Sequence, residues 1–414
     1  MSSTGNSVDP THSLETDVLI VGGGPVGLFT AYRLGIIYER LLKSAVDELH
    51  NVKSFWGYNF ESIEEIKDAV YSTIHDPNGK PIVVKSKYTI GCDGAGSRVR
   101  SLVGINAPRE GINPEEFINK QLGGWGKPFN IKVSEVGVIS KWEATVALAD
   151  SFRSSKGRVF LSGDSAHRLT PAGGHGLNSG IHDVFDLTWK LAANIHGWGG
   201  ETLLESYNKE RRSAAELNIK MVWKAMTEIM LPRFTSTEES GRERLIANSE
   251  EGQMARSLLQ ERIMRGEWIH RQLGTTLGHR YKDTPVIIAD TSSMEPRESI
   301  TEYVPSTWPG VKAPHVVLTD GQKSILDLCG PNFTVVDFTP SGTLADKFCN
   351  TATALKIPIT KVHLPNEAHC RKVWERDVVL VRPDWFVAWR SASGETVVEN
   401  IDTADILLKV VGKA

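Results

Sequence analysis

The segment that most constrains the fold of this chain is Gly163-Asp-Ser-Ala-His167, followed by Pro171-Ala-Gly-Gly-His-Gly-Leu-Asn178. An apolar run, Val159 to Leu161, precedes it and predicts a short buried strand. Asp164 would stand at the end of this strand, where its carboxylate can accept hydrogen bonds from sugar or ribityl hydroxyls. Three glycines follow that would let the backbone approach a flat ring, because glycine has no Cβ. They are Gly173, Gly174 and Gly176. The segment therefore predicts a pocket for a large polar cofactor.

An amphipathic helix is predicted after the glycines, because apolar residues recur there at helical spacing. The residues on this face are Ile181, Val184, Phe185, Thr188, Leu191, Ala192 and Ile195. Asn178 and Ser179 are the expected caps. The free amides and positive end of this helix could stabilise negative charge on a bound ring. The alternative is an ordinary strand, loop and helix without a ligand.

Two earlier segments also place glycines after a predicted strand. Asp17 to Val21 is followed by Gly22-Gly-Gly-Pro-Val-Gly27 and an apolar helix, the G-x-G-x-x-G context in which a helix N-terminus can hold a pyrophosphate. The segment Tyr88 to Arg100 ends its strand in Asp93 and Gly94, and Arg98 or Arg100 could face a phosphate or carboxylate. Taken alone, each segment could also be a simple glycine turn.

In this order the three segments resemble the flavoprotein aromatic hydroxylases, the FAD-dependent monooxygenases typified by p-hydroxybenzoate and phenol hydroxylase. The resemblance rests on Gly22 to Gly27, on Cys92-Asp-Gly-Ala-Gly-Ser-Arg98, and on Arg158 to His167 with Pro171 to Asn178. It implies a reaction in which NAD(P)H reduces FAD and one oxygen atom is transferred to an electron-rich aromatic substrate.

The resemblance also implies roles for individual residues. Gly22, Gly24 and Gly27 would hold the FAD pyrophosphate, and Asp93 and Gly94 would line the groove for FAD and NAD(P)H. Asp164 would bind the ribityl oxygen. On the ring side, the implied residues are Pro171 beside the reactive edge, Gly174 in the turn, and Gly176, Leu177 and Asn178 with backbone groups toward the pyrimidine. His167, His175 and His182 are interpreted as structural, so no catalytic acid or base is nominated.

The C-terminal part extends the resemblance to the fungal phenol hydroxylase branch, through Leu273 to Tyr281, Tyr303 to His315 and Leu380 to Arg390. Strands alternating with a helix predict a small α/β domain there. The predicted strands are Val316 to Leu318, Phe333 to Phe338, Ile359 to His363 and Val378 to Val381, with a helix from Thr343 to Leu355. The family's counterpart is a thioredoxin-like domain used in dimer contacts, so a homodimer is expected.

Thiol chemistry is not expected in this domain, because Pro340-Ser-Gly-Thr343 stands where a redox-active thioredoxin carries paired cysteines. The four cysteines show no C-x-x-C spacing, which argues against a disulfide framework or a zinc site. They are Cys92, Cys329, Cys349 and Cys370. A reducing, cytoplasmic location and no bound metal are therefore expected.

Composition agrees with an enzyme in solution: 40% of the 414 residues are hydrophobic, 23% are charged, and the net charge is -3. Nothing suggests nucleic acid, and no apolar run approaches the ~20 residues of a membrane span. The fold class is α/β, with four segments along the chain. We expect a disordered lead-in (1–16), an incomplete Rossmann-like FAD-binding domain (17–230), a helical connector (231–285) and the thioredoxin-like domain (286–414).

The FAD-binding domain is predicted to be incomplete. A dinucleotide fold needs a second strand that ends in an acidic ribose ligand, yet Ile37 to Leu49 has helical periodicity and Glu39 lies within it. Only Ser101 to Ser162 stand where the family has a large substrate-covering sheet, although Glu115 to Val138 still resemble its last helix and strand. Skipped exons in the gene model, a splice form and a truly diverged protein remain alternative explanations.

Three functions follow from this sequence. The first is an FAD-dependent monooxygenase acting on a small phenolic or polyketide-like aromatic in fungal secondary metabolism. The second is a catalytically silent, dimerising remnant of such an enzyme. The third is a flavin oxidase or dehydrogenase on the same scaffold, which the C-terminal resemblance to hydroxylases disfavours.

Overall fold

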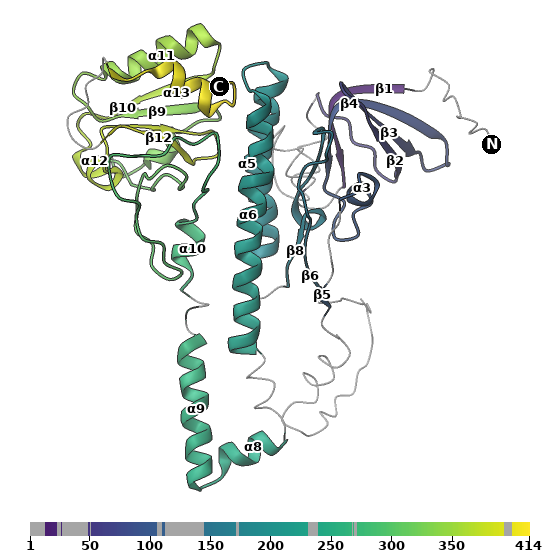
Figure 1. Cartoon of the computed structure of the whole chain (residues 1–414), viewed down its shortest axis with the longest axis vertical. Helices are drawn as coiled ribbons and strands as arrows, with labels where there is room; N and C mark the ends of the chain where they lie inside the picture. The colour runs from purple at the N-terminus through teal and green to yellow at the C-terminus, as the bar shows by residue number, and fades with distance from the viewer. Residues whose placement is uncertain are drawn as a thin grey trace.

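A computed structural model describes residues 13–22, 26, 49, 51–105, 110–111, 145–170, 174–230, 239–266, 268, 271–392 and 400–414. Two long helices, α5 (His175–Ile195) and α6 (Glu201–Ala225), stand between an N-terminal sheet and a C-terminal sheet (Figure 1). Helices α8 (Glu239–Ile246) and α9 (Glu250–Gly266) extend away from both sheets. The mixed α/β fold class is thus confirmed.

The N-terminal sheet has the order β1-β4-β3-β2, and β7 also pairs with β4. Its strands are β1 (Ser13–Val21), β2 (Asn59–Glu65), β3 (Val70–His75), β4 (Pro81–Gly91) and β7 (Val159–Leu161). Strands β1 and β7 run parallel to β4, whereas β2 and β3 form an antiparallel extension. Buried Ile90 and Phe160 pack with Leu187 of α5 and Tyr207 of α6, so the two long helices cover this sheet.

A small antiparallel sheet lies next to it, formed by β5 (Glu110–Gly111), β6 (Thr145–Leu148) and β8 (His167–Arg168). Strand β8 comes directly after a 3-10 turn, Gly163–Ser165, so the Gly-Asp segment connects the two sheets. Helix α3 (Arg98–Leu102) follows β4 in the same region.

The C-terminal sheet has the order β10-β9-β11-β12. Its strands are β9 (Phe333–Asp337), β10 (Ile359–His363), β11 (Val378–Val381) and β12 (Val387–Arg390). Only β9 and β10 are parallel, as expected for strands joined by a crossover helix, here α11 (Thr343–Leu355). Helices α12 (Ala368–Trp374) and α13 (Thr403–Val410) complete this domain.

The two domains share a core. Trp189 of α5 and Leu203 of α6 pack with Phe333, Leu380 and Leu407 of the C-terminal domain. The opposite face of the C-terminal sheet has its own core, which includes Val336, Val379, Cys370 and Trp374. Helices α5 and α6 therefore contribute to the cores of both sheets.

Several predicted boundaries need correction. Strand β1 begins at Ser13, inside the expected lead-in, because Ser13 to Thr16 pair with β4. Helix α5 begins at His175 after Gly174, so Asn178 and Ser179 are not its caps. Val316 to Leu318 do not form a strand, since only an isolated bridge joins Val317 to Ser324.

Other expectations about elements have mixed outcomes. The predictions for β7, α11, β10 and β11 match the structure in their bounds, and β9 matches to within one residue. Helix α10 (Leu273–Leu277) lies with α8 and α9 in the expected connector. The segments Ile37 to Leu49 and Glu115 to Val138 fall outside the described residues, apart from position 49. Within the described ranges, no helix combines the length and apolarity that crossing a membrane requires.

Candidate functional site

The three glycine segments meet at one edge of the N-terminal sheet. The last residues of the three strands are in register, with Val21 of β1 opposite Gly91 of β4 and Gly91 opposite Leu161 of β7. Beyond the strands, the Cys92 amide donates to the Val21 carbonyl at 2.7 Å and the Ser162 amide to the Gly91 carbonyl at 3.1 Å. In open α/β sheets, ligands bind beyond the carboxyl ends of the strands, which makes this edge the candidate site.

Glycines allow the three segments to approach this closely. Gly22 has φ +118°, and a Cβ there would lie 2.2 Å from the Cys92 carbonyl oxygen. Gly163 has φ +63°, and a Cβ there would lie 2.8 Å from Cγ2 of Val26. Gly180 of α5 contacts the same valine. The first glycine motif and the Gly-Asp segment are thus packed directly together.

The loop after β4 is held by its own polar residues. Asp93 accepts hydrogen bonds from the Ser97 hydroxyl and from the amides of Arg98 at 2.7 Å and Val99 at 3.0 Å, and so caps α3. Buried Arg100 donates to the Ser165 carbonyl at 2.7 Å and to the Ala95 carbonyl at 3.2 Å. Of the two arginines considered as anion ligands, Arg100 therefore holds the loop, whereas Arg98 is exposed.

Asp164 differs from its neighbours in this turn. Ser162, Gly163 and Ser165 are buried, but Asp164 is exposed and its carboxylate has no hydrogen-bond partner among the described residues. A Cβ built on Gly94, Gly174 or Gly176 would meet no atom of the described residues within 4 Å. An unpartnered carboxylate beside open glycines suits a ligand that is rich in hydroxyl groups and has a flat ring.

The first turn of α5 faces this region with free donors. Gly174 has φ +68° and is the N-cap, so the amides of residues 175 to 177 have no acceptor within the helix. Leu177 is 51% exposed, and Nδ2 of the Asn178 side chain donates to the Gly174 carbonyl at 2.9 Å. His175 bonds Gln272 at 3.0 Å, and burial lowers its pKa, which keeps the ring neutral.

A buried ionic cluster that was not predicted supports the Gly-Asp turn. Asp183 of α5 accepts from the Gly163 amide at 2.9 Å, pairs with His167 at 2.7 Å and pairs with Arg211 of α6 at 2.9 Å. Burial alone would raise the pKa of Asp183, but the charges of His167 and Arg211 outweigh it and lower this pKa. His167 is therefore structural, as interpreted from the sequence, whereas His182 lies exposed on α5.

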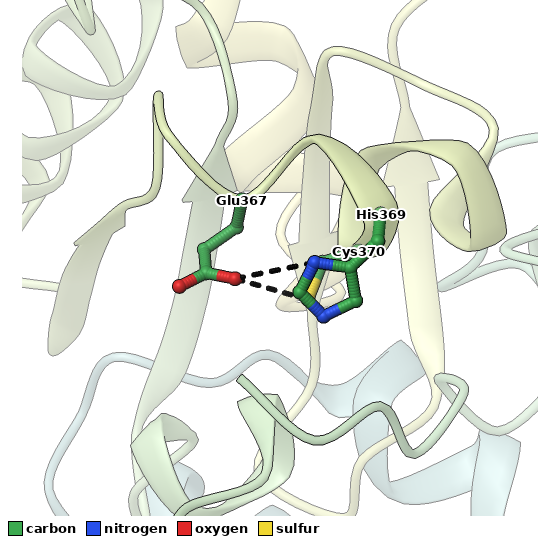
Figure 2. A group of neighbouring side chains, drawn as sticks. All are labelled: Glu367, His369 and Cys370. Carbon is green, nitrogen blue, oxygen red and sulfur yellow. Dashed lines mark hydrogen bonds and ion pairs between the residues drawn. The ribbon is translucent and has the colours of Figure 1, made fainter. Parts of the chain in front are cut away.

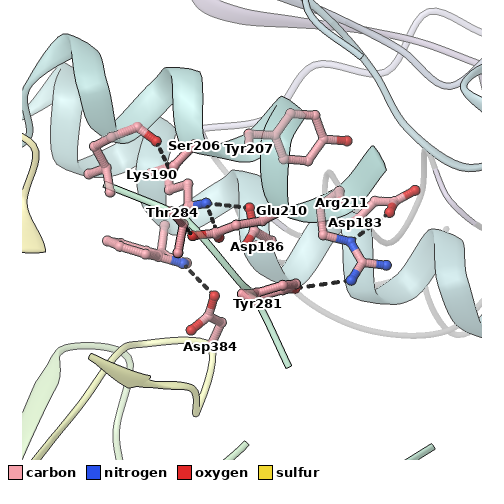
Figure 3. A network of polar contacts seen from close by, with 12 residues as sticks. Asp183, Asp186, Lys190, Ser206, Tyr207, Glu210, Arg211, Tyr281, Thr284 and Asp384 are labelled. Atoms are coloured by element: carbon pink, nitrogen blue, oxygen red, sulfur yellow. Dashed lines mark hydrogen bonds and ion pairs between the residues drawn. The ribbon is translucent and has the colours of Figure 1, made fainter. Parts of the chain in front are cut away.

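A second buried cluster continues along α5 and α6 into the C-terminal domain (Figure 3). Lys190 lies 2.7 Å from both Asp186 and Glu210. Arg382, from the turn after β11, lies 2.9 Å from Glu210 and 3.0 Å from Asp186 and also pairs with Asp384. Burial raises the pKa of Asp186, whereas Arg382 and Lys190 overcome the effect of burial on Glu210 and lower its pKa.

Comparison with known proteins assigns the chain to a family. A model described as "FAD binding domain" matches residues 36–121 and 128–222, and one described as "Aromatic-ring hydroxylase, C-terminal" matches residues 306–414. The FAD-dependent monooxygenase opdD of Penicillium oxalicum is 30% identical over 450 residues, covering 91% of this chain and 84% of that protein. This chain belongs to the FAD-dependent aromatic-ring hydroxylases.

Other members of this hydroxylase family are also similar. The 2,4-dichlorophenol 6-monooxygenase of Cupriavidus pinatubonensis is 29% identical and covers 85% of this chain and 73% of that protein. The solved structure of the flavin-dependent monooxygenase PieE, in complex with FAD and substrate, aligns with a TM-score of 0.81 at 21% identity, covering 97% of this chain and 100% of that one. This structural likeness supports the fold.

Membership of the hydroxylase family identifies the cofactor, and the alignment with one relative shows that this chain is shorter. FAD is the cofactor of these oxidoreductases. The alignment with the Penicillium protein spans 450 positions, more than the 414 residues of this chain, so that relative has segments without a counterpart here.

The structure brings Gly22, Asp93, Gly94, Asp164 and the first turn of α5 to the same edge of the sheet. Gly24, Gly27 and Pro171 lie outside the described residues. Sequence reasoning missed Asp183 and Arg211. The sequence signal that could have found them is a set of charged residues that recur at helical spacing within the predicted amphipathic helix, as Asp183, Asp186 and Lys190 do.

Proposed function

We propose that this hydroxylase uses NAD(P)H and oxygen to hydroxylate a phenolic or polyketide-like aromatic compound in secondary metabolism. The observation that carries the proposal is Asp164, which is exposed and has no partner in the described ranges, at the edge where β1, β4 and β7 end together. The names of the relatives support the substrate class, since they include a dichlorophenol monooxygenase and a putative polyketide hydroxylase.

The proposed FAD contacts follow the arrangement of this edge. Gly22, Gly24 and Gly27 hold the pyrophosphate, Asp164 accepts hydrogen bonds from the ribityl chain, and Asp93 and Gly94 line the groove. On the ring side, the proposed residues are Pro171, Gly174, Gly176, Leu177 and Asn178. Bound FAD supplies the redox chemistry of the reaction. The protein supplies the free amides of residues 175 to 177, which favour negative charge on the ring.

The remaining parts of the proposal concern the architecture. Residues 13–230 form the FAD-binding domain, since β1 begins at Ser13, residues 231–285 connect it, and residues 286–414 form a thioredoxin-like domain through which two copies form a homodimer. The cysteine pattern supports a cytoplasmic location. The two buried ionic clusters keep the first turn of α5 in place relative to both domains, because each charge in them has an oppositely charged neighbour.

A silent remnant is the second candidate, and the alignment favours it because the Penicillium protein carries segments that this chain lacks. If those segments include the residues that cover the substrate, water reaches the reactive edge of the flavin ring. We then expect FAD binding with NAD(P)H oxidation that is not matched by hydroxylated product.

The test begins with the purified full-length chain and its visible spectrum, before and after incubation with FAD. NAD(P)H consumption and product formation are then followed with and without candidate phenols. A yellow protein whose NAD(P)H consumption rises with a phenol, with formation of a hydroxylated product, supports the hydroxylase proposal. A colourless chain that takes up no FAD overturns it, as does a yellow chain that oxidises NAD(P)H without forming a hydroxylated product, and either result supports the remnant. FAD reduction by substrate without NAD(P)H supports an oxidase or dehydrogenase.

A further inference from the structure

Three potential metal ligands gather at the start of α12 in the C-terminal domain. They are the carboxylate of Glu367, the imidazole of His369 and the thiol of Cys370, and one ligand atom of each lies within 4.8 Å of the others (Figure 2). These three residues belong neither to the proposed FAD site, at the ends of β1, β4 and β7, nor to the buried ionic clusters. This group was not predicted from the sequence, where the expectation of no bound metal rested on the absence of C-x-x-C spacing.

The distances in this group suit a tetrahedral ion. Oε2 of Glu367 lies 3.5 Å from Nδ1 of His369 and 3.9 Å from Sγ of Cys370. A tetrahedral zinc ion with bonds of about 2.0–2.3 Å holds its ligands roughly 3.3–3.8 Å apart. Sγ of Cys370 lies 3.4 Å from the other ring nitrogen of His369, Nε2, so the side chains of both residues must rotate before Nδ1, Oε2 and Sγ can bond to one ion.

A neighbouring loop orients two of the ligands. Nε2 of His369 lies 2.8 Å from the Val317 carbonyl, which can only accept, so this nitrogen carries the proton and Nδ1 has the free lone pair. Glu367 accepts from the Thr319 amide at 3.1 Å and from the Thr319 hydroxyl at 2.8 Å. Histidine ligands of metals typically donate their other N–H to a carbonyl or carboxylate in this way.

Exposure and charge also suit a metal. The side chain of His369 is 49% exposed and that of Glu367 is 15% exposed, whereas Cys370 is fully buried. An ion could therefore enter from solvent past the histidine and keep a water molecule in its fourth position. A thiolate and a carboxylate would balance the two charges of the ion, and sulfur with imidazole nitrogen favours zinc over magnesium or calcium.

We propose that Glu367, His369 and Cys370 bind one zinc ion, with water as the fourth ligand. On binding, the Cys370 thiol loses its proton to solvent and its sulfur bonds to the metal. The ion would link α12 to the loop of Val317 and Thr319, and thereby stabilise the C-terminal domain independently of FAD.

The test uses the full chain after treatment with a chelator and dialysis. Co²⁺ is the spectroscopic probe, because a bound thiolate gives a near-ultraviolet charge-transfer band, and Zn²⁺ is then added as the competitor. We expect one equivalent of Co²⁺, displacement by Zn²⁺, a rise in Tm with Zn²⁺ and release of about one proton.

His369→Gln is the main variant, since its exposed side chain is dispensable for the core, and His315→Gln is the matched exposed control. The first should weaken Zn²⁺ binding at least tenfold, and the second should not change it. Cys370→Ala should remove the charge-transfer band, while Cys349→Ala should keep it. The proposal is overturned if the wild-type chain binds no equivalent of Co²⁺ or Zn²⁺, or if His369→Gln binds both as the wild type does. FAD content, measured in parallel, reports separately on the flavin edge.

Discussion

Two aspartates near the start of α5 show opposite uses of the same side chain. Asp164 is exposed and has no partner in the described part of the chain, whereas Asp183 is fully buried and accepts from Gly163, His167 and Arg211. The Gly163 amide, one residue before Asp164, is the group that Asp183 holds. The buried carboxylate therefore fixes the turn that presents the exposed one.

The comparison extends to the two regions around these aspartates. In the ionic clusters, each charged side chain pairs with an opposite charge, so removing one should destabilise the fold. At the edge where β1, β4 and β7 end, the Asp164 carboxylate has no hydrogen-bond partner among the described residues, so removing it should affect the proposed ligand and leave the fold intact.

Arg382→Gln should have the largest effect. Arg382 is fully buried between Asp186, Glu210 and Asp384. Removing its charge takes the paired cation from Asp384 and leaves Asp186 and Glu210 to share Lys190. We expect a loss of roughly 3–5 kcal/mol in the free energy of unfolding, measured by urea denaturation. Arg371→Gln is the control, because its ion pair with Asp377 is about one-third exposed at both side chains and should contribute less than about 1 kcal/mol. Equal effects of the two variants would contradict this account of the buried cluster.

Gly22→Ala should have the second-largest effect, because it disturbs both the fold and the proposed FAD site. The added Cβ would lie 2.2 Å from the Cys92 carbonyl oxygen, at a φ of +118° that only glycine tolerates well. We expect a loss of about 2–4 kcal/mol in stability together with weaker FAD binding. Gly79→Ala is the matched control, since Gly79 also has positive φ but a Cβ there meets no atom within 4 Å. If both variants lose the same stability, strain at φ accounts for the effect and the close approach does not.

Asp164→Ala should leave stability unchanged and weaken FAD binding about ten- to a hundredfold, as expected for the loss of hydrogen bonds to a charged group. Fluorescence titration of the apoprotein with FAD measures the affinity, and thermal unfolding without FAD measures the fold. Asp150→Ala, another exposed aspartate, is the control. A destabilised apoprotein, or an unchanged affinity for FAD, would show that the contrast with Asp183 is wrong.

Prediction from the sequence succeeded where local pattern decides the structure. The apolar run of β7 and the helical spacing of α11 gave the right bounds, and the order of the glycine segments gave the right family. The start of α5 was missed because Gly174, in a left-handed conformation, can cap a helix as well as the polar residues that were expected. The ionic clusters could not be predicted, since they join α5, α6 and the turn after β11, whose contact is set by packing between domains.

The smallest predicted effect concerns His279, a residue beside the buried clusters whose Nε2 is buried without a hydrogen-bond partner in the described residues. Burial and the charge of Arg211 lower the pKa of His279 to about 3. In the unfolded chain a histidine titrates near pH 6.5. Below this pH the unfolded chain therefore binds a proton at position 279 that the folded chain does not bind, and the free energy of unfolding falls as the pH decreases.

Replacing His279 with Gln should therefore reduce the loss of stability between pH 6 and pH 5 by about 1 kcal/mol. Some dependence of the unfolding free energy on pH should remain in this variant, because burial also lowers the pKa of His175. Asp183 does not add to this window, since its lowered pKa makes its contribution fail only as the pH falls below the usual range of a carboxyl group, about pH 4. Urea midpoints at the two pH values measure the change, with His315→Gln as the exposed control. If His279→Gln loses as much stability between pH 6 and pH 5 as the wild type does, the imidazole can take up a proton in the folded chain. Burial and the charge of Arg211 then do not lower its pKa.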